Sequence, residues 1–160
     1  MKNLTLTLLL AGFMTGQAYA AKPGDTDSPA DKAVSTAILA GDVMACDNSD
    51  YPGNTGKTCK GHDTNYRIFY APDRKTALVW VFGYPLGGTG HFGEYAEFKD
   101  ENGWKFVKVF KKPLADAPAP EEQDIQFLPP KAVKVTYHFK KETDSNCCST
   151  GVGHAVLNLQ

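Results

Sequence analysis

The sequence predicts an α+β domain in which one N-terminal helix packs on an antiparallel β-sheet of about five to seven strands. One segment near the N-terminus has apolar residues at helical spacing. The later segments fit strands, and no helical pattern separates them, which favours antiparallel pairing. A length of 160 residues is typical of one domain, which we expect to span residues 30–160.

The first 20 residues have the pattern of a secretory signal peptide. Lys2 gives a basic start, residues 4–13 form an apolar run, and Ala18, Tyr19 and Ala20 fit a small-x-small cleavage site. The run is well short of the roughly 20 apolar residues that cross a bilayer, and no other segment is as apolar over such a length. We therefore expect cleavage after Ala20 and a periplasmic or secreted protein with no membrane-inserted segment.

The composition argues against a nucleic-acid partner. Hydrophobic residues make up 42% of the chain and charged residues 22%. Without the predicted signal peptide, which carries Lys2, 16 basic residues remain beside 18 acidic ones, so the net charge is −2. Strong binding to a phosphate backbone depends on an excess of basic groups, which this chain lacks.

The helix is predicted from its start and stop signals. Residues 21–29 are polar with little to bury, and predict a disordered leader. Ser28 is expected to be the N-cap, Pro29 the first helical residue and Asp31 the capping-box acid. Gly41 marks the C-terminal end. The apolar positions at helical spacing are Ala33, Val34, Ala37 and Ile38.

The strands are predicted from alternation and from one apolar run. Residues 77–82 are continuously apolar and predict a central strand that is buried on both faces. Asn102-Gly103 is a strong hairpin signal, and Pro72-Asp73 marks another turn. Residues 113–130 hold five prolines and predict a long connection with at most one short strand. The segments that fit strands are 66–70, 77–82, 91–99, 104–111, 125–128, 133–139 and 151–159, with helix as an alternative for 92–98.

Four cysteines follow the predicted signal peptide: Cys46, Cys59, Cys147 and Cys148. An even number in an oxidising compartment predicts two disulfides, for which three connectivities are open. The pair Cys46–Cys59 is favoured because it closes a short polar loop, which would stabilise the fold by roughly 3 kcal/mol. It leaves Cys147 and Cys148 as a strained, easily reduced vicinal bridge, whereas the other connectivities would staple the last strands to the rest of the chain.

The segment Cys59-Lys60-Gly61-His62-Asp63 lies directly before the strand that contains Arg67-Ile68. It resembles the Ivy family of vertebrate lysozyme inhibitors. In that family a Cys-Lys-Pro-His-Asp-Cys loop protrudes between strands of an α+β fold and inserts its histidine into the active-site cleft of a c-type lysozyme. There the histidine forms hydrogen bonds with the two catalytic carboxylates. The resemblance therefore implies a protein that blocks the active site of another protein.

The resemblance implies a role for each residue of this loop. His62 would enter the target cleft, since a protonated imidazole has two N–H donors and can bridge two carboxylates. Lys60 and Asp63 would shape and charge the loop around it. Gly61 and Thr64 stand where the family has the stiff proline and the closing cysteine, so the short bridge of the family is absent. An ordinary polar turn before a strand is the alternative interpretation.

A second candidate binding loop is rich in glycine and follows the predicted central strand. It contains a formal G-x-G-x-x-G pattern that ends at Gly93, but the chain lacks the strand-helix alternation of a dinucleotide-binding domain. We expect a wide loop that a ligand approaches closely, or a plain connection. The candidate residues of this loop are Tyr84, Gly88, Gly90, His91 and Glu94.

No catalytic or metal-binding motif accompanies these loops. The four histidines are scattered, without H-x-x-x-H or H-E-x-x-H spacing, so neither a metal nor another cofactor is expected. A serine-nucleophile motif is also absent. His91 and Glu97 share strand parity, and with Glu94 they define an alternative, a small periplasmic enzyme. A redox protein based on Cys147-Cys148 is a related alternative.

The sequence therefore predicts an exported binding or inhibitor protein rather than an enzyme. The expected partner is a protein, namely a lysozyme or another cell-wall hydrolase. A periplasmic immunity protein against a cell-wall-degrading toxin would need the same cleft-blocking loop and is the closest alternative. The target and the oligomeric state stay open at this point.

Overall fold

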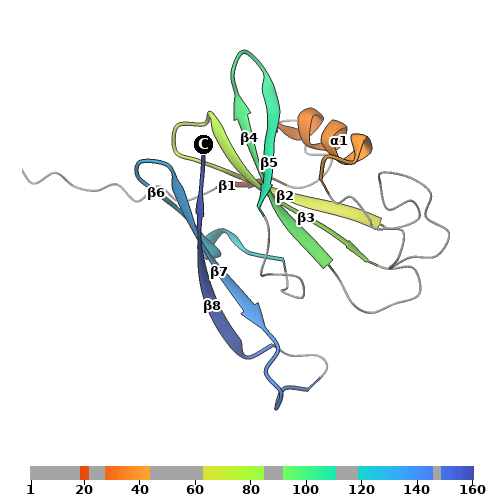
Figure 1. Ribbon diagram of the computed structural model, residues 1–160, viewed down its shortest axis with the longest axis vertical. Helices are drawn as coiled ribbons and strands as arrows, with labels where there is room; N and C mark the ends of the chain where they lie inside the picture. The colour runs from red at the N-terminus through yellow and green to blue at the C-terminus, as the bar shows by residue number, and fades with distance from the viewer. Residues whose placement is uncertain (1–18, 22–27, 44–62, 85–91, 111–118, 146–148) are drawn as a thin grey trace, which may run out of the picture.

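The structure is a computed structural model that describes residues 19–21, 28–43, 63–84, 92–110, 119–145 and 149–160. These residues form an α+β fold, the class that the sequence predicts (Figure 1). In chain order the elements are β1 (Tyr19–Ala21), α1 (Asp31–Ala40), β2 (Asp63–Tyr70), β3 (Thr76–Tyr84), β4 (Phe92–Asp100), β5 (Trp104–Phe110), the 3₁₀ helix η1 (Glu122–Asp124), β6 (Ile125–Leu128), β7 (Ala132–Phe139) and β8 (Gly151–Asn158).

The described strands form two antiparallel sheets rather than the single sheet of about five to seven strands that we expected. The larger sheet has the order β1-β2-β3-β4-β5 and the smaller sheet the order β6-β7-β8. The helix α1 packs on one face of the larger sheet, and the smaller sheet packs on the other. Alternation of apolar and polar residues in a strand shows that one face of the strand is buried. It does not show whether the strand joins the edge of a sheet or belongs to a second sheet that packs on its face.

The strand β3 is central and buried on both faces, as its apolar run predicts. Ala77, Val79 and Val81 belong to the core beneath α1. Leu78 and Trp80 belong to the second core, beneath the smaller sheet. All five side chains are at most 1% exposed. Burial of each large side chain stabilises the fold by about 1.5–3 kcal/mol, so β3 contributes to both cores.

Two tyrosines of β2 hold α1 in place. The Tyr66 hydroxyl donates a hydrogen bond to Oδ1 of Asp31 at 2.6 Å. The Tyr70 hydroxyl accepts the main-chain N–H of Ala30 at 3.0 Å and lies 2.6 Å from the Ser28 hydroxyl. These bonds add direction to the apolar contact between the helix and the sheet.

The helix ends at the residue that the sequence predicts, but its N-cap is a different residue from the one expected. Its N-cap is Ala30, which makes no side-chain capping bond, so the prediction of Ser28 as N-cap was wrong. The Ser28 hydroxyl bonds to Tyr70 of β2 instead. At the other end Gly41 has a φ of 78° and its N–H bonds to the carbonyl of Ile38. A left-handed residue there satisfies the last carbonyls of the helix, as expected for a terminal glycine.

The tight turns of the larger sheet follow the predicted signals. Between β2 and β3, Oδ1 of Asp73 accepts the N–H of Lys75 at 2.8 Å. Between β4 and β5, Asn102 and Gly103 both have positive φ, and the N–H of Gly103 donates to Oδ1 of Asp100 at 2.8 Å. Asn and Gly adopt such φ values at low cost, which explains why these residues mark the hairpin.

The strand β1 lies across the predicted cleavage site. It pairs with β2, and Ala20 is opposite Phe69. Cleavage after Ala20 would leave only Ala21 of this strand. Ser28, at the end of the predicted leader 21–29, is buried. Within the described parts of the chain, no helix is long and apolar enough to cross a membrane.

Candidate functional site

The two loops predicted to bind a partner adjoin neighbouring strand ends of the larger sheet. Asp63, the first residue of β2, is opposite Tyr84, the last residue of β3. Gly83 in turn is opposite Phe92, the first residue of β4. We call the ends of β2, β3 and β4 at Asp63, Tyr84 and Phe92 the loop-bearing sheet end. Paired strands are about 4.8 Å apart. The segment that ends at Asp63 and the segment that begins after Tyr84 are therefore attached to the sheet at neighbouring points.

Most residues that the sequence predicts for these loops lie outside the described residues. Asp63 and Tyr84 are placed by their backbones in β2 and β3. Glu94 is half-buried in β4 and shares the parity of Ala96 and Phe98, which face α1. The predicted residues outside the described parts are Cys46, Cys59, Lys60, His62, Gly88, Gly90, His91, Cys147 and Cys148. The predicted disulfides therefore also lie outside them.

Aromatic residues support the loop-bearing sheet end from the side of the smaller sheet. The ring centroids of Trp80 and Tyr95 are 4.5 Å apart, and the buried Nε1 of Trp80 has no hydrogen-bond partner among the described residues. A Cβ at Gly93 would lie 2.3 Å from Cζ2 of Trp80. Burial raises the pKa of the Tyr95 phenol well above its usual range, and the charge of Asp124 adds to this shift. Close packing against Trp80 therefore accounts for the last glycine of the G-x-G-x-x-G pattern.

Arg67 fastens the chain before η1 to β2. Its Nη1 donates to the carbonyl of Pro120 at 2.9 Å and lies 2.8 Å from Oε1 of Glu121. Arg67 belongs to the strand that follows the predicted inserting loop. In the structure Arg67 therefore joins two parts of the chain that are far apart in the sequence.

Glu97 does not form the exposed acid of a His91–Glu97 pair. Its side chain is fully buried in β4, and its two oxygens accept the main-chain N–H of Gln160 at 2.9 and 3.1 Å. The ammonium groups of Lys99 and Lys108 lie 3.9 and 3.6 Å from it. Two positive charges and an N–H donor thus balance one buried carboxylate, as a buried charge requires.

The same lysines also bind the end of the chain after β8. Lys108 Nζ donates to the main-chain oxygen of Asn158 at 2.7 Å, and Lys99 Nζ donates to that of Gln160. Sequence reasoning missed this cluster because its members come from three separate segments. The one local signal is a charged residue between the two apolar residues Ala96 and Phe98.

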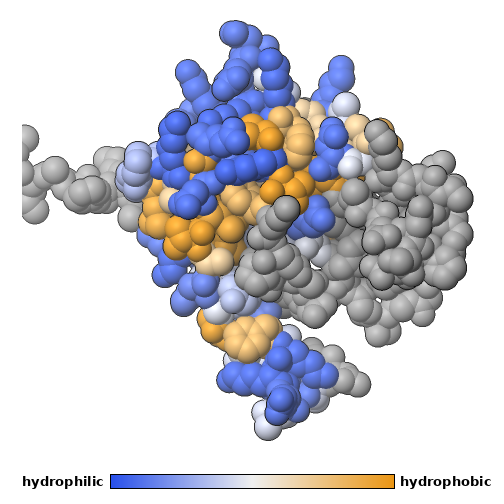
Figure 2. Space-filling model, viewed as in Figure 1, coloured by the Kyte–Doolittle hydropathy of each residue, from blue (hydrophilic) through white to orange (hydrophobic). Residues whose placement is uncertain are grey.

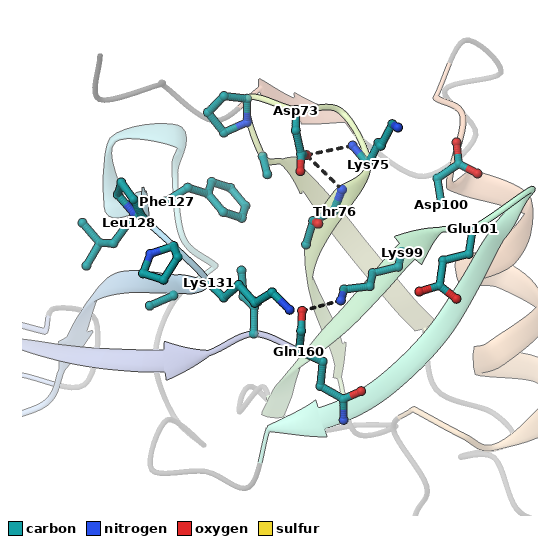
Figure 3. A pocket seen from close by; sticks show the side chains of 16 residues that line it. Asp73, Lys75, Thr76, Lys99, Asp100, Glu101, Phe127, Leu128, Lys131 and Gln160 are labelled. Carbon is teal, nitrogen blue, oxygen red and sulfur yellow. Dashed lines mark hydrogen bonds between the residues drawn. The ribbon is translucent and has the colours of Figure 1, made fainter. Parts of the chain in front are cut away.

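A cavity of about 450 Å³ lies at the opposite end of the larger sheet from the two loops. The turn between β2 and β3, the turn between β6 and β7 and the chain after β8 meet there. Lys131 and Lys99 extend toward Gln160 from opposite sides, and Phe127 forms part of an apolar wall (Figure 3). Apolar residues gather around the contact between the two sheets, while hydrophilic residues cover the tip of the β4–β5 hairpin (Figure 2).

The cavity contains none of the residues that the sequence predicts for the site. Its carboxylate from Asp73 is bonded to turn amides, and its Lys99 is bonded to Gln160. Among the residues that the structure describes, no three His, Cys, Asp or Glu side chains are grouped so as to hold a metal ion. No protein-family model matches the chain, and comparisons with curated proteins and with solved structures find no match.

Proposed function

We propose that this protein is an exported inhibitor that blocks the active site of a cell-wall hydrolase, in the first place a c-type lysozyme, with residues 59–63. The observation that carries the proposal is the pairing of Asp63 with Tyr84. It gives the segment with His62 and the glycine-rich segment neighbouring starting points, so that both can meet one target. The resemblance of residues 59–63 to the Ivy loop supplies the target class.

A rigid base is what such an inhibitor needs. His62 immediately precedes β2, which is hydrogen-bonded to β3 along its whole length. Below the paired ends, Trp80 and Tyr95 are buried. A binding residue attached to a rigid scaffold loses less freedom on binding than one attached to a mobile chain, so more of its interaction energy remains as affinity.

The chemistry of the target explains the choice of histidine. Glycoside hydrolases of the lysozyme type use two carboxyl groups that flank the scissile bond. An imidazolium places N–H donors on opposite sides of a small ring, and hydrogen bonds between charged partners are about twice as strong as neutral ones. His62 would therefore bind both carboxyl groups at once and exclude the substrate.

The proposal is tested by lysozyme inhibition in a cell-wall turbidity assay, with the purified protein from Ala21 onward. We expect the wild type to inhibit, and His62→Ala to lose inhibition without loss of the folded circular dichroism spectrum. The matched control is His154→Ala, because His154 is exposed on β8 in the other sheet. It should inhibit like the wild type.

Two results would contradict the proposal in different ways. Wild-type protein that does not inhibit at micromolar excess would overturn lysozyme as the target, and other wall hydrolases, including toxins, would then be assayed in the same way. Inhibition that survives in His62→Ala would overturn the loop mechanism. Substitution of His62 by Gln separates charge from hydrogen bonding, since glutamine keeps one donor group and loses the positive charge.

A further inference from the structure

The strand β8 is an outer edge of the smaller sheet, and the direction of its main-chain groups follows from one hydrogen bond. The N–H of Leu159 donates to the carbonyl of Lys131 at 2.9 Å, and these two residues continue the register in which Ala132 is opposite Asn158. A bond between directly opposite residues marks a hydrogen-bonded pair of an antiparallel ladder. Such pairs alternate, so every second residue of β8 bonds to β7.

The other residues of β8 direct their main-chain groups away from β7. Two contacts with the larger sheet support this alternation. The carbonyl of Asn158 accepts a hydrogen bond from Lys108, and the N–H of Gln160 donates one to Glu97. Further along the strand the outward groups belong to Val152, His154 and Val156. Among the described residues no strand pairs with β8 on this side.

The same three residues carry exposed side chains without a fixed charge. Val152 is 55% exposed and Val156 is 58% exposed. His154 is also exposed, and its Nδ1 lies 3.2 Å from the hydroxyl of Thr136 on β7. Gly151–Asn158 contains no Lys, Arg, Asp or Glu, although edge strands are commonly protected by charged side chains.

We propose that two copies of this chain associate through β8, antiparallel, with the two-fold axis at His154. In this register Val152 of one copy lies opposite Val156 of the other, and His154 lies opposite His154. All three pairs join residues whose main-chain groups face outward, so about six main-chain hydrogen bonds would form. The smaller sheets of the two copies would become one continuous sheet.

The observations favour a second copy over an unrelated strand. The order Val-x-His-x-Val reads the same in both directions, so antiparallel self-pairing places each exposed valine against a valine. No side chain with a fixed charge meets its own copy across this axis. The strand β5, at an edge of the larger sheet, carries Lys105 and Lys108 and would repel its own copy.

Among the described residues, the surroundings of β8 leave its outer edge open over part of its length and close it near the C-terminal end. The β7–β8 hairpin extends away from the rest of the described chain (Figure 1). Apolar surface continues onto this hairpin (Figure 2). At the other end Lys108 and Glu97 already occupy the outward groups of Asn158 and Gln160. The interface therefore covers residues 152–156 and is small, which predicts a reversible dimer rather than a permanent one.

Sedimentation velocity from about 10 μM to about 1 mM tests association, since small interfaces dissociate in this range. We expect a monomer–dimer equilibrium in the wild type. His154→Lys places two ammonium groups opposite each other at the axis and should weaken the dimer at least tenfold. The matched control is His138→Lys, because His138 lies on β7, one strand away from the axis. It should leave the equilibrium unchanged.

Amide hydrogen exchange tests the register without any substitution. Dimer formation should slow exchange at Val152, His154 and Val156 as the protein concentration rises. Gly153 and Ala155, which already bond to β7, should not change. A wild type that stays monomeric up to about 1 mM would overturn the proposal. A dimer that persists in His154→Lys would form through another surface and would also overturn it. Protection that does not alternate along β8 would do the same.

Discussion

The buried carboxylate of Glu97 on β4 accepts the main-chain N–H of Gln160, 63 residues further along the chain, with both of its oxygens. This contact fastens the chain after β8 to the larger sheet. It crosses the boundary between the two sheets, where Lys108 also reaches Asn158. Glu97 and its donors thus add a polar link between the two sheets to the apolar core that they share.

Glu97→Ala should lower the free energy of unfolding by about 3 kcal/mol, because it leaves Lys99 and Lys108 without their shared anion and Gln160 without an acceptor. Glu97→Gln should cost less, since the amide oxygen still accepts a hydrogen bond. Urea unfolding measures both. Glu101→Gln, in the exposed turn after β4, is the control and should change stability by less than about 0.5 kcal/mol. An equally small change in Glu97→Ala would contradict the assigned role.

Tyr70→Phe should lower the free energy of unfolding by about 1–2 kcal/mol, because the buried N–H of Ala30 and the hydroxyl of Ser28 lose their partner. The ring contact with Trp104, at 5.4 Å between centroids, would remain. Tyr137→Phe is the matched control, since no hydrogen bond to the Tyr137 hydroxyl is found in the described part of the chain. Thermal unfolding of the two variants side by side gives the comparison. Equal losses would show that the Tyr70 hydroxyl is not needed to hold α1.

Gly93→Ala should destabilise the protein by about 1–3 kcal/mol, because the added methyl group would overlap the Trp80 ring. In a Trp80→Leu background the same substitution should cost less, since the smaller side chain leaves space for it. Denaturant unfolding of both single variants and the double variant gives the coupling free energy. Additive effects would show that Trp80 does not set the requirement for glycine.

Asp144 should titrate well below an ordinary aspartate. Hydrogen bonds from the N–H groups of Thr150 and Lys141, and from the Thr150 hydroxyl, lower its pKa from 3.8 to about 2. Because the folded pKa is the lower one, the carboxylate stabilises this turn above pH 3.8, and the contribution is lost as the pH falls toward 2. An NMR titration of the Asp144 carboxyl group should give a midpoint near 2. A midpoint near 3.8 would mean that these bonds do not hold in solution.

Local patterns were sufficient to predict most of the strands. The apolar run 77–82 lies within β3, and Asn102-Gly103 forms the turn between β4 and β5. Both signals depend on neighbouring residues only. The division into two sheets could not be predicted in this way, because it depends on which faces of distant strands meet.

Two polar residues show the same limit at the level of side chains. Ser28 has the local pattern of an N-cap, but its hydroxyl bonds to Tyr70, 42 residues away. Glu97 has the parity of a candidate acid, but Gln160 and two lysines enclose it. That the two predicted loops adjoin neighbouring strand ends follows from the register of β2, β3 and β4, which the residues within each loop do not reveal.

The placement of β3 between two cores has a consequence for how the protein unfolds. Val79 contacts the core beneath α1, and its neighbour Trp80 contacts the core beneath the smaller sheet. Neither layer can detach without exposing one face of this strand to water. We therefore expect the helix and the smaller sheet to melt in a single cooperative transition, with the amides of β3 as the last to exchange.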